Sequence, residues 1–217
     1  RLHPPPLCPS YAMSGEALVS YYYMDDSTDK SATSYKSYSA SAISGYVSSV
    51  LARSTRYYGD TDTWMYEALS AFPVRGMKGL IVGSNVPWYE AMCVAHGADC
   101  TTLEYNDLDY EGLHTVTVED FKEPEDEGER YDFVWSISSF EHDGLGRYGD
   151  PLDPDADIEA MRLCRGRIRE GGKMFLSVPV GLDEVVWNEG RVYGRARWKR
   201  MVEGYEVVGE FGRVEWG

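Results

Sequence analysis

The sequence lacks two patterns that would directly indicate its class of protein: a close pair of cysteines and a long apolar run. None of its four cysteines forms a CxxC pair, so the usual structural zinc sites are excluded. No apolar stretch approaches the ~20 residues that cross a bilayer. We therefore predict no transmembrane segment in this chain and no secretory signal peptide in its first residues.

The cysteines also bear on the compartment. Cys93 and Cys100 flank the end of an expected helix, and we interpret them as small residues of the hydrophobic core. Because nothing in the cysteine usage demands an oxidising compartment, we predict a cytoplasmic protein. The chain begins at Arg1 and not at Met, so a leader or membrane anchor that has been removed stays an open alternative.

Positive charge is scarce. The chain has 21 basic and 36 acidic residues, which gives a net charge of -15. Such a chain repels a phosphate backbone, so we predict no nucleic-acid partner. Acidic residues are concentrated in 119–129, which we interpret as a solvated loop, and basic residues in 162–169 and 191–200.

What is present is a regular alternation of short apolar segments and helical patterns. We predict strands at residues 78–82, 99–103, 114–118, 131–137, 173–178 and 205–210. We predict helices at 63–71, 88–95 and 153–169. This order predicts an α/β fold with a doubly wound, mainly parallel sheet of the Rossmann-like kind. A seventh strand would have to be short or to use an unexpected segment.

The first 59 residues have a different character. Four prolines lie within the first ten residues, and residues 14–58 are rich in Ser, Tyr and Ala. Apolar spacing favours helices at 17–24 and 40–53, with irregular chain between them. We predict an N-terminal extension over residues 1–59 that packs on an α/β domain over residues 60–217.

The candidate cofactor site begins after the first domain strand. Ligands of such folds bind beyond the carboxyl ends of the strands, where Gly83-Ser84-Asn85 leads into a helix. This loop has one glycine in place of a glycine-rich turn, so an ordinary turn is an equal alternative. Glu104 ends the second strand 21 residues after Gly83, the spacing expected of an acid that binds ribose hydroxyls.

Two further strand ends supply candidate residues. Asp120 follows the third strand and could hold an adenine edge, although a solvated acid is slightly favoured there. Ser138 follows the fourth strand, just before Glu141 and His142, and we assign it to the cofactor. His142 is the candidate general base and Glu141 its orienting partner, with a purely structural pair as the alternative.

A glycine-rich loop at residues 144–151 predicts a shaped substrate loop. We assign Asp143, Arg147 and Tyr148 to substrate binding, since a guanidinium such as that of Arg147 can grip a carboxylate or phosphate. Arg147 could instead pair with a nearby aspartate. Several aspartates follow within residues 150–157, but their spacing fits helix capping better than a metal site, so we predict no metal.

Residues 138–151, SSFEHDGLGRYGDP, resemble the signature of DUF268, a family of uncharacterised proteins related to S-adenosylmethionine (SAM) methyltransferases. The segments GGKMFLSVPVG at 171–181, VVWN at 185–188 and RVYG at 191–194 are similar to it as well. The resemblance covers roughly residues 60–212. It implies the methyltransferase fold and a SAM site, but it implies no substrate.

These observations lead to one functional prediction and two alternatives. We predict a SAM-dependent methyltransferase that methylates a hydroxyl group of a small molecule or sugar. The first alternative is a catalytically silent methyltransferase-like module that serves as a subunit of a larger assembly. The second is a nicotinamide-dependent oxidoreductase, which is disfavoured because its pyrophosphate needs the glycine-rich turn missing here.

Overall fold

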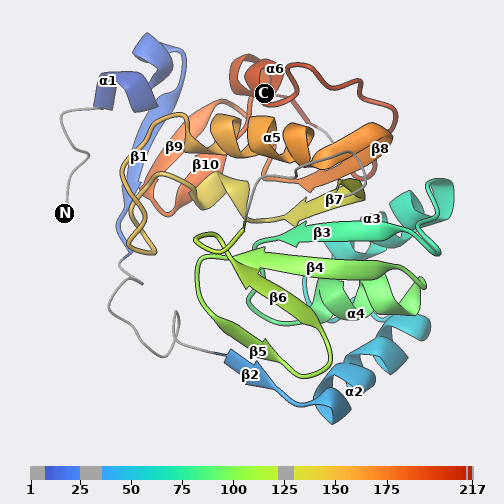
Figure 1. The fold of residues 1–217 in the computed structure, drawn as a ribbon. Helices are drawn as coiled ribbons and strands as arrows, with labels where there is room; N and C mark the ends of the chain where they lie inside the picture. The colour runs from blue at the N-terminus through green and yellow to red at the C-terminus, as the bar shows by residue number, and fades with distance from the viewer. Residues whose placement is uncertain (1–7, 25–35, 122–129, 214, 217) are drawn as a thin grey trace.

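A five-stranded parallel sheet forms the centre of the molecule (Figure 1). The computed structural model describes residues 8–24, 36–121, 130–213 and 215–216. In spatial order the strands are β6 (His114–Thr117), β4 (Asp99–Glu104), β3 (Lys78–Val82), β7 (Tyr131–Ile137) and β8 (Ile168–Ser177). The five strands predicted for this part of the chain are therefore confirmed.

The strand order fixes where a ligand can enter the sheet edge. The chain moves outward from β3 through β4 to β6, then returns to pair β7 with the other side of β3. This reversal is the doubly wound, Rossmann-like arrangement that the sequence predicted. The loops that follow β3 and β7 run in opposite directions from this point, which opens a crevice between them.

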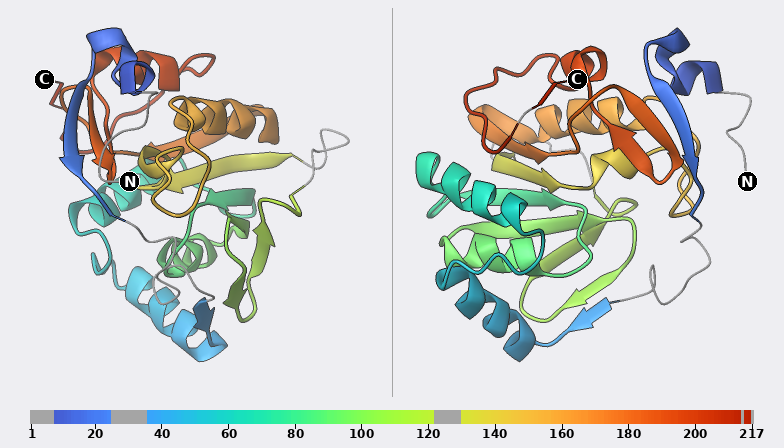
Figure 2. Two further views of the ribbon diagram at one scale, coloured as in Figure 1. Left: turned by 90° about the vertical axis from the view of Figure 1, so that its left-hand side faces the viewer. Right: turned by 180° about the vertical axis from the view of Figure 1, so that it is seen from behind.

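Helices cover both faces of the sheet because neighbouring strand residues point to opposite sides (Figure 2). Ile81 faces a core built with α2 (Ala40–Leu51), α3 (Asp60–Ala71) and α4 (Trp88–Ala95). Leu80 faces a second core built with α5 (Ala156–Arg167) and α6 (Arg195–Met201). None of the described helices combines the length and apolarity needed to span a membrane.

The N-terminal segment contributes strands to two small sheets. β1 (Leu18–Tyr22) pairs in parallel with β9 (Glu184–Asn188), and β10 (Gly190–Val192) pairs with the other side of β9. The helix predicted at residues 17–24 is therefore wrong, because pairing with a distant strand outweighs a weak local pattern. Farther along, β2 (Lys36–Tyr38) pairs with β5 (Leu108–Tyr110).

The second helix predicted for the N-terminal segment is present in the structure. The helix predicted at 40–53 is confirmed as α2, whose first turn is capped by the Ser39 hydroxyl accepting the Ala42 N–H. The remaining short helical turns are α1 (Cys8–Tyr11), η1 (Met13–Gly15) and η3 (Phe140–His142). Most of the proline-rich arm and residues 122–129 of the acidic run lie outside the described residues, and the domain boundary at residue 60 stays a prediction.

The strand predicted at residues 205–210 is wrong. After β10 and α6, the described chain to residue 216 contains no strand, and it follows an irregular path. Val207 and Val208 are exposed there, while the Tyr205 hydroxyl reaches back to the Met161 carbonyl at 2.8 Å. The apolar alternation alone favoured a strand, but these side chains do not enter either core.

Cys93 and Cys100 form a disulfide that ties the end of α4 to the start of β4. Cys93 is fully buried, as the sequence predicted, but the interpretation of both residues as unbonded core residues is wrong. Only seven positions separate them, and the short turn between helix and strand brings their side chains together. Cys164 is a free and buried thiol.

Candidate functional site

A cavity of about 430 Å³ lies at the carboxyl ends of β3, β4 and β7, a volume suited to a small organic ligand. Most of the predicted site residues line it together, although they come from four separate loops. The predicted residues in its lining are Gly83, Ser84, Asn85, Glu104, Ser138, His142, Asp143 and Tyr148. Asp120, Glu141 and Arg147 are not part of that lining.

Gly83 lets the two loops at the crevice approach each other. Its φ of 80° lies in the left-handed region, and a Cβ there would stand 2.2 Å from the Ser139 hydroxyl oxygen. A side chain at position 83 would therefore push the loop after β3 away from the loop after β7. This close approach explains why position 83 is a glycine. It does not require further glycines in the loop.

Glu104 lies across the loop after β3. Its Oε2 accepts the Ser84 N–H at 2.9 Å and its Oε1 accepts the Tyr105 N–H at 2.8 Å. Two backbone donors therefore fix a partly buried carboxyl group at the cavity wall. This is where an acid would have to stand to accept hydrogen bonds from ribose hydroxyls.

A second acid that the sequence did not single out lies close to this loop. Glu90 of α4 is 2% exposed, and its Oε1 accepts the Thr102 hydroxyl at 3.0 Å. Burial raises the pKa of Glu90 to about 7, and the nearby Glu104 adds to the effect. In the sequence Glu90 sits within an apolar helical stretch, so only the packing of α4 beneath the loop reveals its place.

Asp120 is not brought together with the other predicted cofactor residues. It is exposed, its Oδ2 accepts the Thr117 hydroxyl at 2.8 Å, and its N–H donates to the same Thr117 oxygen. This is a local turn at the end of β6. Val118 and Asn106 line the cavity in this region instead.

Ser138 and Glu141 form a short contact behind the loop after β7. Ser138 has a φ of 51°, an uncommon conformation for a residue with a side chain, and its hydroxyl donates to Glu141 Oε1 at 2.6 Å. Glu141 is 2% exposed. Burial raises its pKa above the usual value, and the Ser138 hydrogen bond opposes that rise.

His142 is oriented by a backbone carbonyl. Its Nδ1 lies 2.5 Å from the Glu189 oxygen, which can only accept, so Nδ1 carries the proton and Nε2 has the free lone pair. Glu141 Oε1 is 3.9 Å from Nε2, beyond hydrogen-bond distance. The predicted orienting role therefore falls to Glu189 of the β9–β10 turn. Sequence reasoning missed it because any residue supplies a carbonyl.

The predicted substrate residues separate into two groups. Asp143 and Tyr148 line the cavity, and Tyr148 contacts the His142 ring edge to face with centroids 5.8 Å apart. Burial raises the pKa of Asp143 to about 8 despite the nearby Arg191. Arg147 lies outside the lining, with its guanidinium 5.0 Å above the Tyr148 ring and donating to the Glu189 carbonyl.

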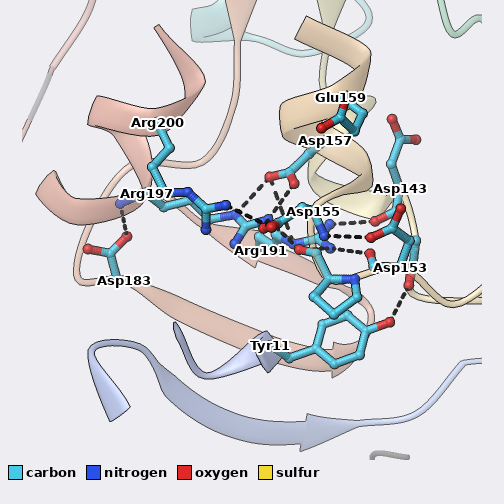
Figure 3. A network of polar contacts seen from close by, with 12 residues as sticks. Tyr11, Asp143, Asp153, Asp155, Asp157, Glu159, Asp183, Arg191, Arg197 and Arg200 are labelled. Carbon is cyan, nitrogen blue, oxygen red and sulfur yellow. Dashed lines mark hydrogen bonds and ion pairs between the residues drawn. The ribbon is translucent and has the colours of Figure 1, made fainter. Parts of the chain in front are cut away.

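Behind the cavity, Arg191 holds the loop in place (Figure 3). It is 1% exposed, and Tyr11 secures the same loop by donating its hydroxyl to the Gly144 carbonyl at 2.6 Å. The guanidinium of Arg191 donates to the carbonyl oxygens of Glu141 (3.4 Å), Asp143 (2.5 Å), Asp153 (3.4 Å) and Pro154 (3.3 Å).

Asp157 supplies the charge that balances these buried arginines. It is fully buried, pairs with Arg197, and accepts the Tyr193 hydroxyl at 2.8 Å. Burial alone would raise the pKa of Asp157, but Arg191 and Arg197 hold it below its usual value. Within the described ranges no group of three or more His, Cys, Asp or Glu side chains is arranged to hold a metal ion.

A family model matches residues 76–215, which include all four loops of the cavity. The chain belongs to the family described as Caenorhabditis protein of unknown function, DUF268. The resemblance noted in the sequence is thus confirmed. The DUF268 segment at 138–151 is the loop after β7, and the segment at 191–194 begins with Arg191, which donates to carbonyl oxygens of that loop. No curated protein is significantly similar to the chain.

Among solved structures, the DUF268 chain is similar to a candidate sarcosine dimethylglycine methyltransferase from Galdieria sulphuraria. The two are 20% identical, with a TM-score of 0.33. The match covers 50% of this chain and 42% of the other, so this chain spans less than half of that protein. The strand order of the sheet identifies the fold independently of this similarity.

Proposed function

We propose that this protein is a SAM-dependent methyltransferase that acts on a hydroxyl group of a small molecule or glycan. One observation carries the proposal: Gly83, Glu104 and His142 line a single cavity at the reversal of a doubly wound sheet. When bound, SAM supplies a methyl group on a positively charged sulfur, ready for transfer to a nucleophile. The acidic cavity suits a cofactor that bears positive charge.

The residues that would hold the cofactor line up along the crevice. Glu104 accepts hydrogen bonds from the ribose hydroxyls, and the loop from Gly83 to Asn85 contacts the methionine portion, with Ser138 opposite. Val118 and Asn106 flank the adenine end in place of Asp120. The left-handed Gly83 keeps this approach free of a side chain.

His142 performs the proton transfer. Its Nε2 would accept the hydroxyl proton, and the acceptor oxygen would bond to the methyl carbon as the methyl–sulfur bond breaks and SAH leaves. The Glu189 carbonyl keeps the imidazole in the required tautomer, since Nδ1 is committed to it at 2.5 Å. Most of the rate comes from holding the two reactants in contact. Asp143 and Tyr148 bind the acceptor beside His142.

One observation favours the alternative of a silent module. The Ser84 amide already donates to Glu104 at 2.9 Å, so one backbone donor of the loop is occupied within the protein. The same contact disfavours a dinucleotide, whose pyrophosphate needs free amides at this turn. Calorimetry with several cofactors separates these possibilities.

The disulfide bears on the location of the proposed activity. Disulfides persist in oxidising compartments and are rare in the cytosol. The Cys93–Cys100 bond thus favours a secretory or extracellular setting over the cytoplasm that the sequence predicted. A glycan or a small hydroxylated molecule is the acceptor class consistent with that setting.

Titration calorimetry with S-adenosylhomocysteine (SAH), SAM and NAD tests the proposal. We expect SAH and SAM to bind and NAD not to bind. Glu104→Ala should weaken the affinity for SAH about 10- to 100-fold, because the charged hydrogen bonds to the ribose are lost. Asp120→Ala is the matched control, an exposed acid outside the cavity, and should leave the affinity unchanged. If the folded wild-type protein binds no SAH, the methyltransferase proposal is wrong.

A further inference from the structure

One wall of the cavity is formed by Tyr57, Tyr58 and Tyr89, here termed the tyrosine cluster. The Tyr58 and Tyr89 rings are nearly parallel, with centroids 6.3 Å apart and planes at 18°. The Tyr57 ring contacts both of them edge to face, with its centroid 4.4 Å from that of Tyr58 and 6.1 Å from that of Tyr89. The proposed cofactor contacts and the His142 proton transfer leave this aromatic surface unused.

A buried acid holds the cluster in this arrangement. Asp62 is fully buried, and its Oδ2 accepts the backbone N–H groups of Tyr57 at 2.9 Å and Tyr58 at 3.1 Å. Its Oδ1 accepts the Tyr89 hydroxyl at 3.1 Å and the Trp88 indole N–H at 3.0 Å. The rings are therefore held in position by the protein itself, which lowers the cost of binding a ligand against them.

The charged groups around the cavity have one sign. Its lining includes the carboxyl groups of Glu104 and Asp150, and among the described lining residues there is no Lys or Arg. The Asp143 carboxyl also lines the cavity, but its raised pKa of about 8 keeps it largely protonated at neutral pH. Arg147, a cation of the same loop, is directed to the Tyr148 ring and the Glu189 carbonyl. An anionic acceptor would meet carboxyl groups here, whereas a cation would be attracted to them.

We propose that the acceptor is a hydroxylated amine, such as an amino sugar or amino alcohol, whose ammonium group binds against the tyrosine cluster. Aromatic faces attract ammonium groups through their quadrupole, and the effect grows where water is excluded. This inference rests on the proposed function, and it names the substrate class of the same site. It also removes Arg147 from the role of gripping a substrate anion.

A matched series of hexoses tests the charge preference. Glucosamine, glucose and glucuronate are titrated into the SAH-saturated protein by calorimetry at neutral pH. We expect glucosamine to bind about tenfold more tightly than glucose, and glucuronate to bind most weakly. Glucose or glucuronate binding as tightly as glucosamine would overturn the proposal.

Position 58 provides the test of the aromatic contact, because Tyr58 is 42% exposed and its replacement removes little from the buried core. Tyr58→Leu should abolish the preference for glucosamine over glucose, while Tyr58→Phe, which keeps the ring, should retain it. An unchanged preference in Tyr58→Leu contradicts the cluster's role.

SAH affinity is measured in both variants and should match the wild type. Loss of SAH binding in the wild type would refute the proposed function instead. The amine subsite would then be judged by the same titrations without SAH.

Discussion

The two sides of the cavity are built by different means. On the side proposed for the cofactor, here termed the cofactor side, Glu104 reaches Ser84 across two adjacent strands, and Gly83 supplies the close approach. On the side proposed for the acceptor, here termed the acceptor side, Arg191 reaches back 37 to 50 positions to hold the loop that carries His142. The first arrangement follows from strand-end spacing, whereas the second depends on a hairpin that packs from elsewhere in the chain.

The difference has an energetic consequence. The cofactor side uses backbone amides and partly exposed acids, whose loss can be compensated by water. The acceptor side buries Asp157 with Arg191 and Arg197, all 2% exposed or less. Taking these charges out of water costs free energy that only a complete network returns. We therefore expect the acceptor side to be the more sensitive to single substitutions.

The largest effect should come from Arg191→Met. The substitution leaves Asp157 with one guanidinium fewer and removes the donor to four carbonyl oxygens. We expect a loss of about 3–5 kcal/mol in the free energy of unfolding, measured by urea denaturation. Arg200→Ala is the control, because Arg200 pairs with Asp155 at the surface and should cost less than ~1 kcal/mol. If both variants lost the same free energy of unfolding, the acceptor side would not be the more sensitive of the two.

The disulfide constrains α4 and β4, whose opposite ends border the cavity at the loop after β3 and at Glu104. Replacing Cys93 and Cys100 by alanine should lower the free energy of unfolding by about 2–3 kcal/mol, because the unfolded chain gains freedom. Dithiothreitol should destabilise the wild type and leave the double variant unchanged. If reductant left the stability of the wild type unchanged, the bond would contribute nothing to the free energy of unfolding.

A smaller effect should be the pH dependence of the free energy of unfolding that comes from Asp143. Burial raises its pKa to about 8, well above the value near 3.9 of an unfolded aspartate, so the folded state holds a proton that the unfolded state loses. This contribution to stability is complete below about pH 4 and is lost as the pH rises through 8. Asp143→Asn should therefore gain about 1–3 kcal/mol relative to wild type between these limits. A difference that is constant with pH would contradict this.

The sequence predicted most of the sheet but not all of its surroundings. Five strands were expected where β3, β4, β6, β7 and β8 lie, because short apolar segments alternate there with helical patterns or turns. β1 and the β9–β10 hairpin were missed, since their pairing partners are distant or their strands too short to show a pattern. The false strand at 205–210 shows the converse, because alternation without a partner forms no sheet.

The candidate site divides in the same way. Glu104 was identifiable because it ends a strand and His142 because it lies in the loop after one, and parallel strands bring their carboxyl ends together. The Glu189 carbonyl has no sequence signature, and neither do the rings of Tyr57 and Tyr58 as a cavity wall. Arg147 was assigned to an anion from its loop alone, yet the structure directs it to Tyr148.

By itself, the sequence determined the alternation of strands and helices, and with it the sheet edge at which Gly83, Glu104 and His142 meet. This follows because strand and helix periods are local properties of the chain. Only the tertiary structure decided that Arg191 and Glu189 hold the His142 loop, and that Asp62 fixes a tyrosine wall beside it. Those contacts depend on burial and on partners far apart in sequence, which no local pattern records.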